Sequence, residues 1–255
     1  EDLGKALLIV EVVAAGMQPQ KNIEQGMCSR IMTGALLPSG ADFVFMFEES
    51  EPAGENMVRY CGKAPRCNIS YRAEDVLSGE VVIRPGCIIR PQEIAIMAMA
   101  GCTKLHVGKK AHIGIVSTGN ELIEPDKKPS GARIRNSNAW QLLAQIDRAG
   151  AIGKYYGIAA DNKESTRKLI EAALSENDII VITGGVSAGD FDLVPGVLDD
   201  LGLKMLFDSV AVQPGKPMKL YTGNRKIVFG LPGNPVATFV QFEVIVRPLI
   251  AKMMG

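Results

Sequence analysis

The stretch that most constrains the fold of this chain spans residues 178–194 and reads DIIVITGGVSAGDFDLV. Its four consecutive β-formers at 179–182 are typical of a strand that is buried on both faces of a parallel sheet. A Thr-Gly-Gly turn ends this strand, and the polar loop that follows carries Asp190 and Asp192. Open α/β sheets bind ligands at the carboxyl edge of their strands, where backbone N–H groups suit anions. Taken alone, the two glycines fit a tight turn from a strand into a helix equally well. The other loops are therefore needed to distinguish a ligand-binding loop from such a turn.

The composition excludes several classes of protein. Lys+Arg and Asp+Glu each number 28 in 255 residues, so the net charge is zero and no global field favours nucleic acid. No apolar run approaches the roughly 18 residues that span a bilayer. The early ALLIVEVVAA segment carries Glu11, which predicts a strand rather than a signal peptide.

The five cysteines favour a reducing compartment. No two of them are spaced as a C-x-x-C motif. Cys61 and Cys67 are close enough in sequence to form a metal or disulfide pair, but ordinary residues of a reducing cytosol are the favoured interpretation. We therefore expect a soluble, cytoplasmic protein that contacts neither nucleic acid nor membrane.

Three segments of different pattern predict a multidomain α/β protein. Residues 1–72 read as a small β-rich domain, because short apolar runs alternate with Pro, Gly and Asn. Residues 73–108 read as a connecting module. Residues 109–255 alternate strand, loop and helix, which predicts a mostly parallel sheet in a three-layer α/β/α domain.

Several local elements are expected within the first two segments. Strands are predicted at residues 7–13 and at 43–47, which read FVFMF, and another at VVIRPG, residues 81–86. A short buried helix is predicted to begin at Pro91 and to end before Gly101. Its Met and Ala side chains are expected to be core packing.

Polar residues predict the starts of three helices in the α/β domain. Asn136 or Ser137 is expected to cap the first, and Asp161 or Asn162 the second. Asn234 is expected to open the last, a long apolar helix whose macrodipole favours negative charge at this end.

Five polar or glycine-rich loops follow the predicted strands and are therefore expected to meet at one edge of the sheet. They read STGNE (117–121), AADN (159–162), TGGVSAGDFD (183–192), QPGKP (213–217) and GLPGNP (230–235). Their acids suit Mg²⁺, their glycines admit phosphate to the backbone, and Lys216 can neutralise an oxyanion. Taken singly, Asp161 and Asp190 fit solvated helix caps equally well. With no P-loop and no G-x-G-x-x-G after the first strand of the sheet, the loops predict a Mg²⁺-assisted site for a phosphate-bearing small molecule.

These motifs, in this order, resemble those of the molybdopterin molybdenumtransferase family, which comprises MoeA-type proteins and the E domain of gephyrin and its plant relatives. The matching stretches are RIMTGALLPSGAD, AEDV, GIVSTGNEL, RIRNSN, TGGVSAGDFD, QPGKP and LPGNPVA. The resemblance covers nearly the whole chain.

The resemblance implies an enzyme that hydrolyses the adenylate of adenylylated molybdopterin and inserts molybdate at the dithiolene, with Mg²⁺. It implies a homodimer in which the site lies between the molybdopterin-binding domain of one subunit and the small domains of the other. A contact with a molybdopterin adenylyltransferase is also implied.

Site residues follow from the same resemblance, motif by motif. The catalytic positions are Asp75, Glu121, Asp161 and Asp192, and the last three of these are also the implied Mg²⁺ ligands. The implied substrate-binding positions are Thr33, Thr118, Gly119, Gly184, Gly185, Ser187, Gly189, Pro214, Gly215, Lys216, Pro232, Gly233, Asn234 and Pro235.

Some residues depart from the family pattern. Gln213 stands where Lys is common and Ala237 where Ser is common, which predicts a weaker or differently built oxyanion site. Ala73 replaces a more usual Gly. The family's Ser-Ala-Met-Asp-Gly-Tyr motif is expected before Glu1, and its β-barrel domain after Gly255.

Two other interpretations stay open. The same α/β domain serves molybdopterin adenylyltransferase-like proteins and CinA-like nucleotide-processing proteins, although residues 1–108 argue against both. The chain could also be a protein-docking scaffold with a vestigial site, against which the preservation of all five loops argues.

Overall fold

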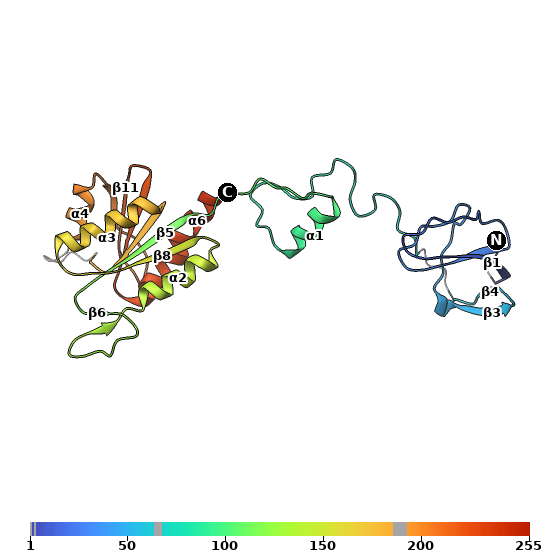
Figure 1. Cartoon of the computed structure of the whole chain (residues 1–255), viewed down its shortest axis with the longest axis horizontal. Coiled ribbons are helices and arrows are strands. Elements are labelled where there is room, and N and C mark those ends of the chain that lie inside the picture. Colours follow the sequence, from blue (N-terminus) through green and yellow to red (C-terminus); the bar gives the residue numbers. More distant parts are fainter. Residues whose placement is uncertain (1, 3, 64–67, 186–192) are drawn as a thin grey trace. The chain divides into compact units, whose positions relative to one another are not determined.

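The computed structural model describes the chain except residues 1, 3, 64–67 and 186–192, and it contains two compact units, 1–83 and 84–255 (Figure 1). The finer division at residues 72 and 108 stays a prediction. Three of the predicted site residues, Ser187, Gly189 and Asp192, lie outside the described residues, as does Asp190.

The first unit is built on a four-stranded sheet in the order β2-β1-β4-β3. Its strands are β1 (Ala6–Val13), β2 (Met27–Ile31), β3 (Ser50–Gly54) and β4 (Met57–Tyr60). β1 pairs in parallel with β2 and antiparallel with β4. The strand predicted at residues 7–13 and the β-rich character of this region are therefore confirmed.

The strand predicted at residues 43–47 is wrong. Residues 43–46 are irregular and lead into a short 3₁₀ helix, η1 (Phe47–Glu49). The rings of Phe43 and Phe45 pack against Tyr60 of β4, with centroid distances of 5.6 and 5.4 Å. The Asn68 side-chain amide donates to the carbonyl of Val44 at 3.1 Å, a carbonyl that a strand would offer to a neighbouring strand. Phe43 and Phe45 thus form an aromatic cluster with Tyr60 instead of a strand of the sheet.

Helix α1 (Pro91–Met99) has the predicted bounds but is not buried. Ile94 is 56% exposed and Met99 is 61% exposed, so these side chains are not core packing within the described chain. A local ion pair fixes the helix start, because the Glu93 carboxylate accepts from the backbone N–H of Arg90 at 2.8 Å and from its guanidinium at 2.6 Å. This pair holds the pKa of Glu93 down at about 2.

The strand predicted at VVIRPG is also wrong. Residues 81–86, all of them described, are irregular, with a bend at 83 and a turn at 85–86. Val81 is 69% exposed, and no neighbouring strand is paired with this segment in the described chain. An apolar run that finds neither a ladder partner nor a core has no reason to stay extended.

Ala73 lies in a backbone conformation that suits glycine. It is the third residue of a turn closed by the Glu74 N–H donating to the Tyr71 carbonyl at 3.1 Å, and its φ is +69°. A left-handed φ costs an L-residue such as alanine about 1–2 kcal/mol, and glycine avoids this cost. Glycine loses more conformational entropy on folding than alanine does, which offsets part of that advantage.

We expect Ala73→Gly to raise the free energy of unfolding of the first unit by up to about 1 kcal/mol. Ala41→Gly is the control, because Ala41 has no positive φ. The substitution there relieves no strain and only raises the conformational entropy of the unfolded chain, so it should destabilise the unit. Scanning calorimetry on the two variants measures the difference. A lower stability of Ala73→Gly than of the unmodified chain would contradict the argument.

The second unit is organised by a six-stranded sheet in the order β10-β11-β12-β9-β5-β8. Its strands are β5 (His112–Thr118), β8 (Ile152–Ala159), β9 (Ile179–Thr183), β10 (Lys204–Ser209), β11 (Pro217–Gly223) and β12 (Lys226–Leu231). β9 pairs in parallel with β12 on one side and β5 on the other, and every residue of β9 is buried. The predicted central, doubly covered strand is confirmed.

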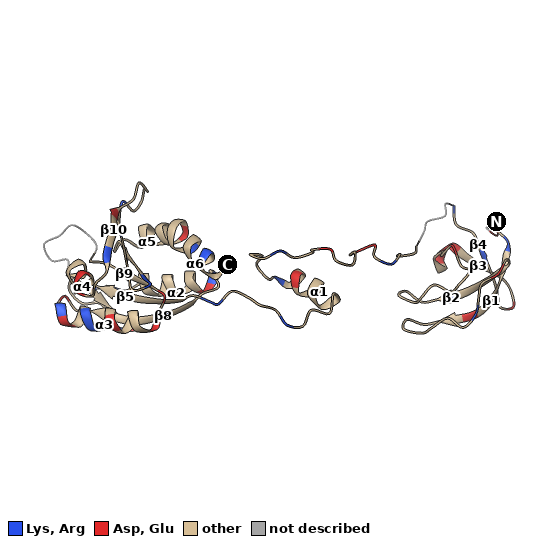
Figure 2. Cartoon of the chain, turned by 90° about the horizontal axis from the view of Figure 1, so that it is seen from above, with Lys and Arg blue, Asp and Glu red and all other residues tan. Residues whose placement is uncertain are grey.

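Helices cover both faces of this sheet (Figures 1 and 2). On one face lie α2 (Asn138–Arg148), α5 (Pro235–Gln241), the π-helix η2 (Phe242–Val246) and α6 (Arg247–Met254), and on the other α3 (Lys163–Glu176) and α4 (Val194–Asp200). Leu142, Ile146 and Phe242 fill the first core and Ile170 and Val197 the second. The three-layer α/β/α domain is confirmed.

Outside the main sheet, the chain between β5 and α2 forms a small parallel ribbon of β6 (Leu122–Ile123) and β7 (Ile134–Arg135). Of the helices in the described part of the chain, none has both the length and the apolar composition that crossing a membrane requires.

Candidate functional site

The strand directions bring the five predicted loops to one edge of the sheet. β12, β9, β5 and β8 are parallel, and β10 runs the same way because it and β12 are both antiparallel to β11. Each of the five loops follows one of these strands. β5 leads to α2 on one face and β9 leads toward α4 on the other, so the boundary between these two adjacent strands is the topological switch point, the place at which such sheets bind ligands.

The loops after β5 and β8 are joined by two reciprocal hydrogen bonds. The backbone N–H of Asn120 donates to Asp161 Oδ2 at 3.2 Å, and the backbone N–H of Asp161 donates to Asn120 Oδ1 at 3.3 Å. Asn162, not Asp161, caps α3, because its Oδ1 accepts from the Ser165 N–H at 2.8 Å. The Asp161 carboxylate is therefore held toward the β5 loop instead of being used as a cap.

Glu121 lies in the same β5 loop and is exposed. Gly119 has a φ of +138°, and a Cβ added to it would lie 2.4 and 2.6 Å from the two carboxylate oxygens of Glu121. The carboxylate thus folds back over a glycine that leaves room for it. Two of the predicted acids, Glu121 and Asp161, come from loops on adjacent strands.

The Thr-Gly-Gly turn after β9 is packed between its two neighbours. Gly184 has a φ of +83°, and a Cβ added to it would lie 2.4 Å from the carbonyl oxygen of Thr118, at the end of β5. On the other side, the Gly184 N–H donates to the carbonyl of Leu231, at the end of β12, at 3.2 Å. The buried Thr118 hydroxyl donates to the Thr183 carbonyl at 3.4 Å. Glycine is required here by close approach as well as by backbone conformation.

The predicted Mg²⁺ site is only partly within the described residues. Among those residues, no three His, Cys, Asp or Glu side chains gather as a metal-binding group, and the third predicted ligand, Asp192, lies outside them. Glu121 and Asp161 supply hard carboxylate oxygens from adjoining loops, a donor set that suits Mg²⁺ completed by water and substrate oxygens. The Mg²⁺ site stays a prediction.

Gln241, at the end of α5, holds the QPGKP loop and was not predicted. It is fully buried, and its side-chain N–H₂ donates to the carbonyls of Gly215 and of Pro217, the latter at 2.9 Å. These carbonyls flank Lys216, whose exposed side chain is thereby presented at the edge of the sheet. The residue lies in a segment that reads as an apolar helix, so no sequence motif marked it.

We expect Gln241→Leu to destabilise the second unit by about 1–3 kcal/mol, because it leaves two carbonyls without their donor. Gln241→Glu, which keeps the size but loses the N–H donors, should be at least as destabilising. Urea denaturation followed by fluorescence of Trp140, the single tryptophan, measures the change. Gln141→Leu on α2, whose amide donates to the Pro235 carbonyl at 3.2 Å from a more exposed position, should cost less. A loss of stability no larger in Gln241→Leu than in this control would refute the assignment.

The Pro-Gly-Asn-Pro turn opens α5 as predicted. Asn234 Oδ1 accepts from the backbone N–H groups of Val236 and Ala237 at 3.0 and 3.1 Å. The Asn138 side chain donates to the Gly233 carbonyl at 2.9 Å and ties this turn to α2. The first N–H groups of α5 are thus already satisfied by the cap, and an oxyanion at this edge would meet Asn234 rather than a bare helix end.

The remaining predicted site residues in the described chain fall as follows. Thr33 and Asp75 lie in exposed turns of the first unit. The other residues are all in the second unit, at the ends of β5 and β9, between β10 and β11, and from the end of β12 to the first residue of α5: Thr118, Gly119, Gly184, Gly185, Pro214, Gly215, Lys216, Pro232, Gly233, Asn234 and Pro235.

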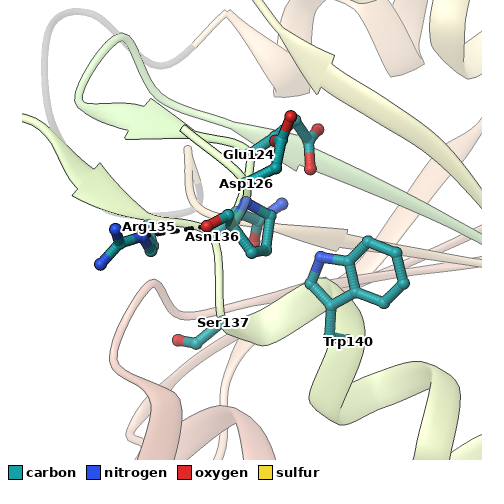
Figure 3. A pocket seen from close by; sticks show the side chains of 7 residues that line it. Glu124, Asp126, Arg135, Asn136, Ser137 and Trp140 are labelled. Carbon is teal, nitrogen blue, oxygen red and sulfur yellow. Dashed lines mark hydrogen bonds between the residues drawn. The ribbon is translucent and has the colours of Figure 1, made fainter. Parts of the chain in front are cut away.

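A surface pocket beside this edge was not predicted. Its volume is ≈ 780 Å³, and the side chains in Figure 3 show it between the β6–β7 ribbon and the start of α2. It is lined by Glu124, Pro125, Asp126, Arg135, Asn136, Ser137 and Trp140. The RIRNSN stretch pointed to this region, but no pattern in it marked a pocket.

A buried hydrogen-bond network lies next to the pocket. The Asn136 side-chain N–H₂ donates to Ser117 Oγ at 3.0 Å and to the Tyr155 hydroxyl at 2.8 Å. The Tyr155 hydroxyl donates in turn to Glu124 Oε1 at 2.9 Å. Burial, together with the Glu124 carboxylate, raises the pKa of Tyr155 well above its ordinary value, so this hydroxyl stays a donor.

Two family models match the chain. "Probable molybdopterin binding domain" matches residues 114–252, and "MoeA N-terminal region (domain I and II)" matches residues 2–101. Curated relatives include the molybdopterin molybdenumtransferases of Staphylococcus epidermidis (strain ATCC 35984), 36% identical over 97% of this chain, and of Bacillus subtilis (strain 168), 35% identical over 95%. The chain spans 59% and 57% of the length of these two relatives.

Solved structures agree with these matches. The molybdopterin biosynthesis MoeA protein from Pyrococcus horikosii is 31% identical, with a TM-score of 0.77 over 98% of this chain and 62% of its own. A molybdenum cofactor biosynthesis protein from Pyrococcus furiosus is 30% identical, with a TM-score of 0.53 over 72% of this chain and 55% of its own.

Proposed function

Because the chain belongs to the MoeA-type family of molybdopterin-binding proteins, we propose that it acts in molybdenum cofactor biosynthesis as a molybdopterin molybdenumtransferase. In the proposed reaction, adenylylated molybdopterin is hydrolysed at its phosphoanhydride with release of AMP, and molybdate is inserted at the dithiolene. The observation that carries the proposal is the convergence of the five motif loops on one edge of the sheet, at the switch point between β5 and β9.

The loops have distinct proposed roles. Glu121 and Asp161, with Asp192, would hold Mg²⁺, which when bound neutralises charge on the phosphoanhydride and positions it. Lys216 and the Asn234 turn would bind anionic oxygens of the substrate or of molybdate. Gly184 allows the turn after β9 to approach Thr118 at the end of β5, and Gly119 leaves room for the Glu121 carboxylate of its own loop. Thr33 and Asp75 of the first unit are proposed as further functional residues on the family resemblance alone.

Further parts of the proposal rest on the family resemblance alone. They are a homodimer, a site shared between its subunits, and a contact with a molybdopterin adenylyltransferase that supplies the substrate. We also propose a cytoplasmic location, which the four free cysteines of the described chain (Cys28, Cys61, Cys87 and Cys102) support.

The test is a direct assay of AMP. The 255-residue chain is titrated with adenylylated molybdopterin in a calorimeter, with Mg²⁺ and with EDTA, and AMP is then quantified by chromatography before and after molybdate is added. We expect AMP release that requires both Mg²⁺ and molybdate. Binding without AMP release would refute the transferase activity of this chain, and the absence of binding would favour the docking-scaffold alternative.

A further inference from the structure

Asn120 joins the two loops that carry the proposed Mg²⁺ ligands Glu121 and Asp161. It directly precedes Glu121 in the loop after β5, and Asp161 lies in the loop after β8. β5 and β8 lie side by side in the sheet, with Thr118 paired to Ala159 where both strands end (Figure 1). The two loops therefore leave the sheet at the same level, which allows one residue of the first to bond to the second.

We propose that Asn120 is a positioning residue for Mg²⁺, because it holds the Asp161 carboxylate with one oxygen, Oδ1, left for the cation. The inference rests on the proposed function, since Mg²⁺ at Glu121 and Asp161 is part of that proposal. It adds a residue to which neither the motifs nor the proposed function gave a role. Asn120 acts through Asp161 and not by touching the metal or the substrate.

The hydrogen bonds between Asn120 and Asp161 form a closed ring. The backbone N–H of each residue donates to the side-chain oxygen of the other, at 3.2 Å to Asp161 Oδ2 and at 3.3 Å to Asn120 Oδ1. Neither side chain can change its rotamer without breaking one of these bonds. Within the described part of the chain, Asp161 Oδ1 has no hydrogen-bond partner. One carboxylate oxygen is thus fixed by the protein while the other stays free to bind a cation.

The Asn120 side of the ring stands on a tight turn. The Leu122 N–H donates to the Gly119 carbonyl at 3.1 Å, which closes a four-residue turn with Asn120 and Glu121 at its centre. The backbone N–H that Asp161 Oδ2 accepts from is therefore held in place, and Glu121 is held by the same turn.

The Asp161 side of the ring is held by α3. The Ala160 N–H donates to Ser165 Oγ at 3.3 Å, and the buried Thr166 hydroxyl donates to the Ala160 carbonyl at 3.4 Å. Asn162, which follows Asp161, caps the same helix. The backbone on both sides of Asp161 is thus fixed from α3, and Asn120 restrains the freedom that remains, which is that of the carboxylate.

The chemistry of Mg²⁺ makes this restraint matter. Mg²⁺ demands near-ideal octahedral geometry with ligands at about 2.0–2.1 Å, so a carboxylate held in one orientation binds it better than a rotating one. Loss of a partner that orients a metal ligand typically weakens metal binding by roughly 10–100-fold. The amide of Asn120 supplies the acceptor that the Asp161 N–H needs, and it does so without placing a third negative charge beside Glu121 and Asp161.

Mn²⁺ provides a test that does not depend on turnover, because carboxylate and water ligands suit Mn²⁺ as they suit Mg²⁺. The 255-residue chain is titrated with Mn²⁺ while free Mn²⁺ is measured by electron paramagnetic resonance, and Mg²⁺ is then added as a competitor. We expect Asn120→Ala to raise the Kd of Mn²⁺ by about 10-fold or more. This variant changes no formal charge, so a loss of affinity reports the lost acceptor. Asn120→Asp keeps the acceptor and should bind Mn²⁺ at least as tightly as the unmodified chain.

A double variant distinguishes positioning from a separate structural effect. Because Asn120 acts through Asp161, adding Asn120→Ala to Asp161→Ala should weaken Mn²⁺ binding no further than Asp161→Ala alone. Asn22→Ala, which removes an exposed asparagine side chain of the first unit, is the control and should leave the Kd unchanged. Urea denaturation followed by Trp140 fluorescence verifies that the second unit of each variant is folded.

An unchanged Kd in Asn120→Ala, an equal loss of affinity in Asn120→Asp, or losses that add in the double variant would overturn the inference. So would the absence of Mn²⁺ binding that Mg²⁺ can displace in the unmodified chain. The AMP-release assay separates this inference from the proposed function. Normal AMP release with an unchanged Kd in Asn120→Ala refutes only the role of Asn120, and a raised Kd in Asn120→Ala without AMP release by the unmodified chain refutes only the transferase activity.

Discussion

Replacing Glu121 with alanine is expected to abolish molybdate-dependent AMP release while leaving the fold intact. The Glu121 carboxylate is exposed, folds over Gly119, and has no hydrogen-bond or ion-pair partner among the residues that the structure describes. Its removal therefore costs little stability. If it helps to hold Mg²⁺ against the phosphoanhydride, its loss should lower turnover by at least about 100-fold, as losses of electrostatic stabilisation at reacting groups do.

The measurement compares AMP release by the unmodified chain, by Glu121→Ala and by Glu171→Ala. Glu171 is an exposed carboxylate of α3 that forms an ion pair with Arg167 at 2.9 Å, a surface pair worth little. We expect Glu171→Ala to keep full activity. A Mg²⁺ titration adds a specific readout, because a lost ligand should raise the Mg²⁺ concentration that half-saturates the rate. Unchanged turnover in Glu121→Ala would remove this residue from the mechanism.

The same logic applies to Asp161, with one difference. Its carboxylate accepts from the Asn120 N–H, so Asp161→Ala would also release the β5 loop from the β8 loop. Asp161→Asn keeps an acceptor at that position and separates the loss of charge from the loss of the hydrogen bond. Glu121 gives the less ambiguous test, because its carboxylate makes no hydrogen bond that joins two loops in the described part of the chain.

Sequence reasoning succeeded where a pattern had a single physical outcome. The run at residues 179–182 consists of β-formers and has no polar face, which favours a strand covered on both sides, and β9 is buried throughout. The loop positions followed because strands in parallel α/β sheets end at the same edge. Asn234 was correctly predicted to open a helix because a side-chain oxygen there can accept from free N–H groups.

It failed where the outcome depended on partners distant in sequence. The FVFMF segment is a short apolar run of the kind that strands have, but the rings of Phe43 and Phe45 pack against Tyr60 and the segment joins no ladder in the described chain. Gln241 looks like a stray polar residue until the carbonyl groups of Gly215 and Pro217 are seen beside it. The pocket at Trp140 exists only because the ribbon of β6 and β7 folds next to α2, which no local pattern reports.

The largest effect on stability is expected from Gly184→Ala. At a φ of +83° an alanine is strained by about 1–2 kcal/mol, and its Cβ would lie 2.4 Å from the backbone carbonyl oxygen of Thr118. This neighbour is backbone in a buried strand, so it cannot move aside as a flexible side chain would. Moving β5 or the turn away should cost a further 1–3 kcal/mol or so, as overpacking does. We therefore expect a total loss of about 2–5 kcal/mol.

Gly196→Ala in α4 is the matched control. Gly196 has no positive φ, and an added Cβ meets nothing within 4 Å, so alanine should stabilise the helix by up to about 1 kcal/mol. Urea denaturation monitored by Trp140 fluorescence reports the second unit, in which both glycines lie. The two variants should shift the transition in opposite directions. If Gly184→Ala proved as stable as the unmodified chain, the turn after β9 would not be packed against Thr118 at the end of β5.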